Sequence, residues 1–325
     1  MNQADRRNLK INAADALDRA SGSPHKIALI HSAASAGLAL AIAALHFVLE
    51  QQIDGTGGLS GIGNRAMLET LQSLLQIAQF VLIPFWEMGL LFVFLSASRH
   101  QAMETRDLTA GFVRFGPVLV GKLLQVALLF SASMVGCYAG ALVFSFSPFS
   151  NAFYKAAEPY LTIGTIDYAV LLADEAVMAS MVWMIPFALL GVLVLLIPTY
   201  YRLRLMDYVL LDQPEKGAFH ALRASRQLMH GKRFDLFKLD LSFWWFYLLE
   251  LLVTAICYGD MILPVLGVDL GISADAAYFA FYALALVFQM GLYAWKKPYL
   301  LTTYGAYYNS LLPKEEAEQQ ETPLK

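Results

Sequence analysis

Three polar side chains lie within long apolar stretches of the sequence, where a polar group is costly. Glu87 lies in LIPFWEMGLLF, Glu250 lies in YLLELLVT, and Gln289 lies in a third apolar stretch. A charge at the centre of a bilayer costs about 2.5–3.5 kcal/mol on insertion scales, so such residues should face the interior of a helical bundle. Two functional interpretations are open, a proton relay and a polar cavity for a solute. The structural alternative is a neutral carboxyl group that hydrogen-bonds a neighbouring helix.

The depth of these groups follows from helix geometry. Glu87 and Glu250 each lie about ten residues from the inner end of a predicted span, which at about 1.5 Å per residue places both near the bilayer midplane. Gln289 is expected somewhat closer to the inner end of its span. No lysine or arginine within the predicted spans offers a partner, because Lys122 is near a span end and can extend to the headgroups. We therefore expect protonated carboxyl groups.

Other residue types that do chemistry show no catalytic or ligating pattern. Both cysteines, Cys137 and Cys257, fall in apolar segments, which is typical of small buried hydrophobic residues. The sequence lacks a phosphate-binding glycine loop and a nucleophile elbow. Six histidines occur without metal-ligand spacing, namely His25, His31, His46, His100, His220 and His230. We expect no metal, no cofactor and no nucleic-acid partner, and a non-enzymatic protein is the favoured interpretation.

The composition is typical of a polytopic membrane protein. Of 325 residues, 58% are hydrophobic and 15% charged, and the mean hydropathy is +0.53. A hydrocarbon core of about 30 Å takes roughly 20 helical residues to cross. The predicted fold is an all-α membrane bundle with six transmembrane helices, at about residues 27–49, 71–97, 118–146, 176–200, 241–263 and 276–295. These form a membrane domain over residues 27–312, after a cytoplasmic amphipathic segment at 1–26 and before a disordered cytoplasmic tail at 313–325.

The distribution of positive charge predicts the orientation of the spans. With the N-terminus inside, 21 of the 23 lysines and arginines fall in inner segments, and Arg65 and Lys155 are the two outside. Cytoplasmic loops of membrane proteins carry such an excess of positive charge. We therefore expect both termini to be cytoplasmic.

The inner loop at residues 201–240 carries a predicted amphipathic helix. Small and apolar residues recur at three- and four-residue steps from Ala218 to Met229, and basic residues fill the rest of the helical wheel. Asp212, Pro214 and Glu215 suit a first helical turn, and Gly231 suits the end. A cationic helix between two spans should lie on the inner membrane surface and contact anionic lipid. The residues expected to contact lipid or a partner are Lys216, Arg223, Arg226, Lys232 and Arg233.

Three further features predict local geometry. Leu9, Ala13 and Leu17 have helical spacing before a break at residues 21–24. Gly136 and Gly140 give the third span a GxxxG step, which permits close approach by a neighbouring helix. Pro186 and Pro198 predict a kink in the fourth span.

The inner loop also resembles a known family. LMHGKRFDLFKLDLSF, with the preceding IPTYYRLRLMDYVLLDQPE, is similar to the signature of the domain-of-unknown-function 975 family of bacterial integral membrane proteins. The match is specific over about the last 130 residues, and the N-terminal half is similar in its span pattern. The layout is more loosely similar to the membrane domain attached to some glycerophosphodiesterases. The positions that carry the family resemblance are Pro198, Asp212, Pro214, Glu215, Met229, Gly231, Phe237, Leu239, Ser242, Phe243, Pro298, Tyr299 and Tyr308.

The resemblance implies a multi-pass protein of the bacterial cytoplasmic membrane and no activity, because the family itself is uncharacterised. Two functional hypotheses follow. The first is a non-enzymatic membrane protein whose cationic inner helices contact anionic lipid, or a membrane or cytoplasmic partner, in an export or envelope process. The alternative is a proton-coupled permease or transporter component that uses Glu87 and Glu250. The orientation of these two carboxyl groups discriminates between the hypotheses. The permease hypothesis expects them to face each other or a cleft.

Overall fold

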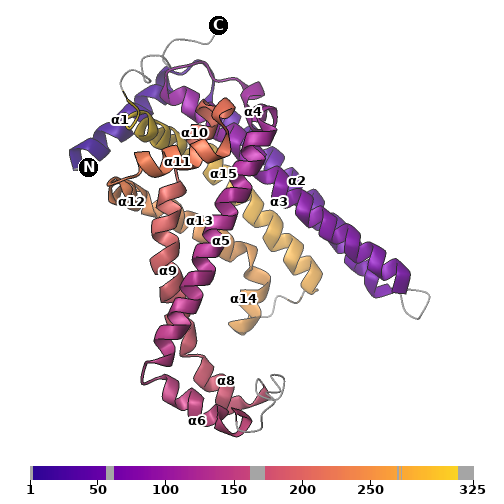
Figure 1. Cartoon of the computed structure of the whole chain (residues 1–325). Coiled ribbons are helices and arrows are strands. Elements are labelled where there is room, and N and C mark those ends of the chain that lie inside the picture. Colours follow the sequence, from indigo (N-terminus) through magenta and orange to yellow (C-terminus); the bar gives the residue numbers. More distant parts are fainter. Residues whose placement is uncertain (1–2, 56–61, 162–172, 269–270, 272, 314–325) are drawn as a thin grey trace. The chain divides into compact units, whose positions relative to one another are not determined.

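The computed structural model describes residues 3–55, 62–161, 173–268, 271 and 273–313 (Figure 1). Every regular element in these ranges is a helix, so the predicted all-α class is confirmed. The helices are α1 (Gln3–Arg19), α2 (Pro24–Gly55), α3 (Ile62–Ser98), η2 (Thr105–Thr109), α4 (Ala110–Val113), α5 (Phe115–Ser145), α6 (Ser150–Leu161), α8 (Glu175–Met181), α9 (Met184–Leu203), α10 (Met206–Asp212), η3 (Pro214–Lys216), α11 (Gly217–Leu228), α12 (Arg233–Leu241), α13 (Trp244–Cys257), α14 (Gly259–Val265) and α15 (Ala274–Asn309).

Several helices are long and apolar enough to cross a membrane, which indicates a multi-pass membrane protein. Among the described residues five segments meet this test, and a sixth does so if one bent pair of helices counts as a single span. The five are Pro24–Leu49, Arg65–Ser98, Phe115–Ser145, Glu175–Asp212 and Ala274–Asn309, and the bent pair is Arg233–Leu241 with Trp244–Cys257. The predicted tail after Pro313 lies outside the described residues.

The region predicted as the fifth span is interrupted twice. Between α12 and α13 the helix axis bends by 64°. At this bend the Ser242 hydroxyl donates to the Leu239 carbonyl oxygen at 2.6 Å, a local hydrogen bond that competes with regular helical bonding. A second interruption at Tyr258 separates α13 from α14.

The chain forms two units, and the first comprises residues 1–119, 207–217 and 234–325. In this unit α15 packs against α1, α2, α3 and α13, and α2 packs against α3 along their length (Figure 1). A buried core joins α2 and α3 to the short helices that follow α3, through Ile27, Ala28, Leu90, Val93, Phe94, Ala97, Met103 and Leu108. The absence of a side chain at Gly89 permits this packing, since a Cβ there would clash with the carbonyl oxygen of Leu108.

The second unit comprises residues 120–206 and 218–233. A Cβ at Gly140 would clash with the carbonyl oxygen of Phe187, and one at Gly191 would clash with that of Gly136. The predicted close approach at the GxxxG step is therefore confirmed, and its partner is α9. Helices α6 and α8 form a smaller pair around the buried residues Ala157 and Val177.

Proline positions in the fourth span differ in their effect. The helix breaks at residues 182–183, so Pro186 falls in the first turn of α9, where a missing N–H group leaves no hydrogen bond unmade. Pro198 lies inside α9, which continues to Leu203. The predicted interruption of this span thus lies before Pro186.

The helix predicted in the loop at residues 201–240 is present as α11. It buries Ala218, Ala221, Leu222 and Ser225, and the Ser225 hydroxyl donates to the Arg202 carbonyl oxygen at 2.8 Å. Gly231 has a φ of +73°, the left-handed conformation that favours glycine, three residues after the helix ends.

Candidate intramembrane site

A strip of polar side chains on one face of α15 organises the candidate site. Gln289, Tyr293 and Lys297 are four residues apart and therefore lie above one another on the helix. The Gln289 side-chain amide donates to the Tyr293 hydroxyl at 3.3 Å. The Lys297 ammonium lies 3.8 Å from the centre of the Tyr293 ring, a cation–π contact. Each member of the strip thus contacts the next.

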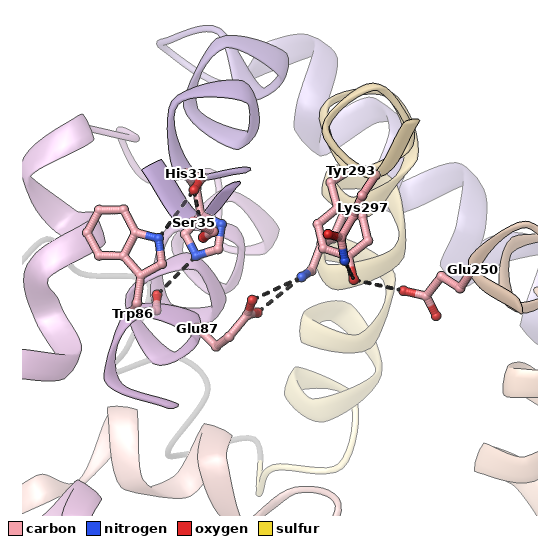
Figure 2. Close-up of polar contacts among 8 residues, drawn as sticks. His31, Ser35, Trp86, Glu87, Glu250, Tyr293 and Lys297 are labelled. Atoms are coloured by element: carbon pink, nitrogen blue, oxygen red, sulfur yellow. Dashed lines mark hydrogen bonds and ion pairs between the residues drawn. The ribbon is translucent and has the colours of Figure 1, made fainter. Parts of the chain in front are cut away.

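Glu87 of α3 forms an ion pair with this strip. Its Oε2 and Oε1 atoms accept hydrogen bonds from the Lys297 ammonium at 3.1 and 3.3 Å (Figure 2). The prediction that Glu87 would have no cationic partner was therefore wrong. It failed because the last span was expected to end at residue 295, whereas α15 continues to Asn309 and carries Lys297 one turn beyond Tyr293.

Glu250 of α13 contacts the same strip from another helix. Its Oε1 atom accepts a hydrogen bond of 3.1 Å from the Tyr293 hydroxyl. In the view of Figure 2, Glu87 and Glu250 lie on either side of Tyr293 and Lys297. Two carboxyl groups that are 163 positions apart in the sequence thus contact side chains one helical turn apart on α15.

A histidine for which the sequence indicated no role lies beside this ion pair. The rings of His31 and Trp86 stack with centroids 5.1 Å apart and planes 9° from parallel. His31 Nε2 lies 3.3 Å from the Trp86 carbonyl oxygen, while Trp86 Nε1 donates to the His31 carbonyl oxygen at 3.3 Å. Only 1% of His31 is exposed, and its Nδ1 atom has no hydrogen-bond partner among the described residues. This double contact fixes Trp86, and with it the start of the turn that carries Glu87.

A cavity of about 410 Å³ lies next to the ion pair, between α2, α3 and α15. Most of its lining is apolar, and its polar groups include Glu87, Gln289 and Tyr293. A second cavity of about 480 Å³ shares lining residues Ala39, Ile42 and Gln79 with the first. Its walls are more polar and include His46, Gln72, Gln76, Asp275, Tyr278 and Tyr282. The two cavities therefore adjoin along the same three helices, and Glu87 faces the first of them.

Comparison with known proteins identifies the family. Residues 4–315 match the family described as "Protein of unknown function (DUF975)". The chain belongs to this family. The match covers nearly the whole chain, including α2, α3 and α15, and so extends beyond the C-terminal residues that carried the resemblance. No curated protein and no solved structure is detectably similar to the chain.

One family position, Asp212, is the centre of a buried ion pair in the first unit. The Arg99 guanidinium donates to both carboxylate oxygens of Asp212, at 2.6 and 2.7 Å, and Tyr308 donates to Asp212 at 2.8 Å. Arg99 also donates to the Asn309 side chain at 3.0 Å. Asp212 ends α10 and does not begin the basic helix, so its predicted capping role was wrong. It connects α10 to the ends of α3 and α15.

The family positions Ser242 and Phe243 form the junction between α12 and α13. Phe243 is 1% exposed, and its ring lies 5.8 Å from that of Tyr299 and 6.1 Å from that of Tyr304. The Lys10 ammonium lies 4.0 Å from the centre of the Phe243 ring and donates to the Ser242 carbonyl oxygen at 3.1 Å. Burial, and secondarily the charge of Arg6, lowers the pKa of Lys10. These positions therefore attach α1 and the bend before α13 to the end of α15.

The remaining family positions divide by burial. Met229, Leu239 and Pro298 are buried, and Pro214 is partly buried. Pro198, Glu215, Gly231 and Phe237 are exposed. The buried members have packing roles, and none of these residues contacts Glu87 or Glu250 in any described interaction.

The predicted lipid-contacting residues are mostly at the surface. Lys216 of η3 is exposed, as are Arg223 and Arg226 of α11. Lys232 is exposed and Arg233, at the start of α12, is partly buried. Their exposure leaves these positive charges accessible.

Proposed function

We propose that this protein is a proton-coupled permease of the bacterial cytoplasmic membrane, with six spans and both termini in the cytoplasm. The positive-inside distribution of lysine and arginine supports this orientation. A sixth crossing would be made by the bent pair α12 and α13. In this arrangement α1, the basic loop with α11, and the end of α15 are all cytoplasmic.

The observation that carries the proposal is that Glu87 and Glu250 both contact the polar strip of α15, where Glu87 also lines a cavity. Ionisable residues inside a membrane domain commonly mark proton or solute pathways. The site has two carboxyl groups and one ammonium group, that of Lys297. With both carboxyl groups ionised it has one net negative charge, and one added proton makes it neutral. His31 adds no charge as the neutral tautomer in which Nε2–H donates to the Trp86 carbonyl oxygen and Nδ1, which is buried without a described partner, carries no proton.

Such a site can couple a proton to a solute, because neutrality inside the membrane requires one positive charge in addition to Lys297. A low-dielectric environment makes an uncompensated charge costly. The proton can reside on Glu87 or on Glu250, and Tyr293 connects the two through its hydrogen bond and its contact with Lys297. A solute in the cavity meets Glu87 directly and would change which carboxyl group holds the proton.

The test is proton movement across reconstituted vesicles. Proteoliposomes with an acidic interior, reported by a pH-sensitive quenched dye, receive glutamate, glucose, alanine or tetraethylammonium. We expect protein-dependent dequenching with at least one solute, and a loss of at least tenfold in its initial rate in Glu87→Gln and in Glu250→Gln. Glu69→Gln is the matched control, because Glu69 lies on the same helix α3 and forms an exposed ion pair with Arg65.

Two results would contradict the permease proposal. One is the absence of protein-dependent proton movement with all four solutes. The other is proton movement that persists unchanged in both Glu87→Gln and Glu250→Gln. Either result would leave the structural interpretation of these carboxyl groups, in which they only join helices.

We infer a second role for the basic surface, contact with anionic lipid of the inner leaflet. The exposure of Arg223, Arg226 and Lys232 supports it, since polybasic segments near a membrane contribute about 1 kcal/mol per charge. Phosphatidylglycerol should raise the melting temperature of the detergent-solubilised protein more than phosphatidylcholine does. Reversing these three charges and that of Arg233 should remove the difference, whereas Lys155→Glu should not. An unchanged difference would count against this role and favour a protein partner in an export or envelope process.

A further inference from the structure

We propose that the cavity beside Glu87 binds a monovalent organic cation with an apolar body, and that the cation takes the place of the exchangeable proton. This inference rests on the proposed permease function and names its substrate class. The charge of the ligand would lie against Glu87, and its apolar part would fill the space between α2, α3 and α15.

The size and lining of the cavity define the body of the ligand. A volume of about 410 Å³ falls in the range of about 300–1,000 Å³ typical of small-molecule sites. Apolar side chains from all three helices line it, among them Leu38, Ile42, Ile83, Leu286 and Met290. Burial of apolar ligand surface against them would supply most of the affinity.

The charge of the ligand follows from the groups that face the cavity. Of the described residues that line it, Glu87 alone has a formal charge. The Glu87 side chain is 43% exposed, whereas its partner Lys297 is 12% exposed and does not line the cavity. An incoming ligand therefore meets the carboxylate, with the ammonium of Lys297 behind it. An anion would be repelled at this point, and a cation would be attracted.

Aromatic rings around Glu87 add a second attraction for a cation. Trp86, Phe112 and Tyr293 all line the cavity, and aromatic faces attract ammonium groups, most strongly when the contact excludes water. Lys297 already makes such a contact with Tyr293 at 3.8 Å. A carboxylate with neighbouring aromatic rings is a suitable environment for a substituted ammonium ion.

Charge balance links cation binding to proton release. The ionisable groups that face one another here are His31 of α2, Glu87 of α3, Glu250 of α13, and Tyr293 and Lys297 of α15. When the two carboxyl groups share one proton the site is neutral. Binding of a monovalent cation adds one positive charge. The shared proton then leaves for bulk solvent, and the site is neutral again. No covalent bond is formed or broken apart from this O–H bond.

The experiment is calorimetric titration of the full-length protein in detergent with benzyltrimethylammonium. The control ligand is neopentylbenzene, which has the same shape with a neutral carbon in place of the nitrogen. We expect the cation to bind at least tenfold more tightly than the neutral compound. Titration in two buffers of different ionisation enthalpy should show the release of up to one proton per bound cation.

The variants have opposite expected effects on the affinity for the cation. Misfolding cannot produce this pattern, because it would weaken binding in every variant. Glu87→Gln should weaken cation binding at least tenfold, and Glu69→Gln should leave it unchanged. Lys297→Met should tighten binding, because it removes the ammonium that competes for Glu87. Equal affinity for the charged and neutral compounds, or no weakening in Glu87→Gln, would overturn the inference. Cation binding without proton release would overturn the exchange.

The two proposals fail separately. Tight cation binding without proton movement in vesicles would retain the ligand class and reject the permease. Proton movement driven by glutamate, glucose or alanine, without cation binding, would retain the permease and reject the ligand class.

Discussion

The ion pair of Arg99 and Asp212 should be among the most sensitive points of the fold. The Arg99 side chain is 11% exposed and that of Asp212 is 5% exposed. Their contact is bidentate at 2.6 and 2.7 Å, and Tyr308 adds a third hydrogen bond to the carboxylate. Removing either partner leaves the other charge buried without its bidentate ion-pair partner.

The expected magnitude comes from this burial. Breaking a buried ion pair from one side typically costs about 3–5 kcal/mol, so Arg99→Met and Asp212→Leu should each lower the free energy of unfolding by about that amount. Replacing both partners by apolar residues of similar size is often neutral. The double variant should therefore be more stable than either single variant.

The assay is unfolding of the purified protein by sodium dodecyl sulfate in mixed micelles, followed by tryptophan fluorescence. The exposed pair Arg65–Glu69, with side chains 59% and 54% exposed, supplies the control. Its disruption should cost only about 0.3–0.5 kcal/mol. Costs of Arg99→Met and Asp212→Leu that do not exceed the control, or that simply add in the double variant, would refute the assigned role of this ion pair.

Four other variants test packing and pH. Gly191→Ala should lower the unfolding free energy by about 1–3 kcal/mol, because its Cβ would clash with the Gly136 carbonyl oxygen. Gly37→Ala, with open space around it, should stabilise the protein slightly, and a destabilised Gly37→Ala would contradict this account. Phe243→Ala should cost about 3–5 kcal/mol in the same assay, and a cost below 1 kcal/mol would show that the helix junction does not depend on this ring. The Tyr160 hydroxyl lies 2.7 Å from Asp174 and lowers the pKa of that carboxyl group below its usual 3.8. The stabilisation that the ionised Asp174 carboxylate gives the fold is therefore present above about pH 4 and is lost as pH falls through the lowered pKa. In Tyr160→Phe, hydrogen exchange at the start of α8 should therefore accelerate at a less acidic pH than in the wild type, and identical profiles would contradict the assignment.

Local patterns were sufficient to predict much of the fold. The length of the apolar stretches located the long helices, and the spacing of the glycines predicted the close approach of a neighbouring helix at Gly136 and Gly140. Hydropathy, however, contains no information on the direction of a helix axis. The 64° bend at Ser242 and Phe243 was therefore not predicted. The serine in this apolar context was a signal for it, because its hydroxyl can bond to the backbone.

The candidate site could be predicted only in part. Glu87, Glu250 and Gln289 were identified because polar residues in apolar stretches are unusual. Their partners were missed for a physical reason, since Lys297 follows the end of the apolar stretch although it belongs to the same helix. His31 is surrounded by apolar and small residues and gave no comparable signal.

Long-range pairing was the other limit. Arg99 and Asp212 are 113 positions apart, and nothing in either local sequence specifies the partner. The resemblance to the family marked Asp212 and Tyr308 as important positions. Their contact with one another and with Arg99 required the three-dimensional arrangement.

The most direct test of the account is an exchange of charges between Glu87 and Lys297. Each single reversal, Glu87→Lys or Lys297→Glu, should lower the melting temperature of the detergent-solubilised protein, because it places like charges about 3 Å apart in a poorly solvated site. The double variant should recover most of the loss. A double variant no more stable than expected from the sum of the single variants would contradict the pairing on which the candidate site depends.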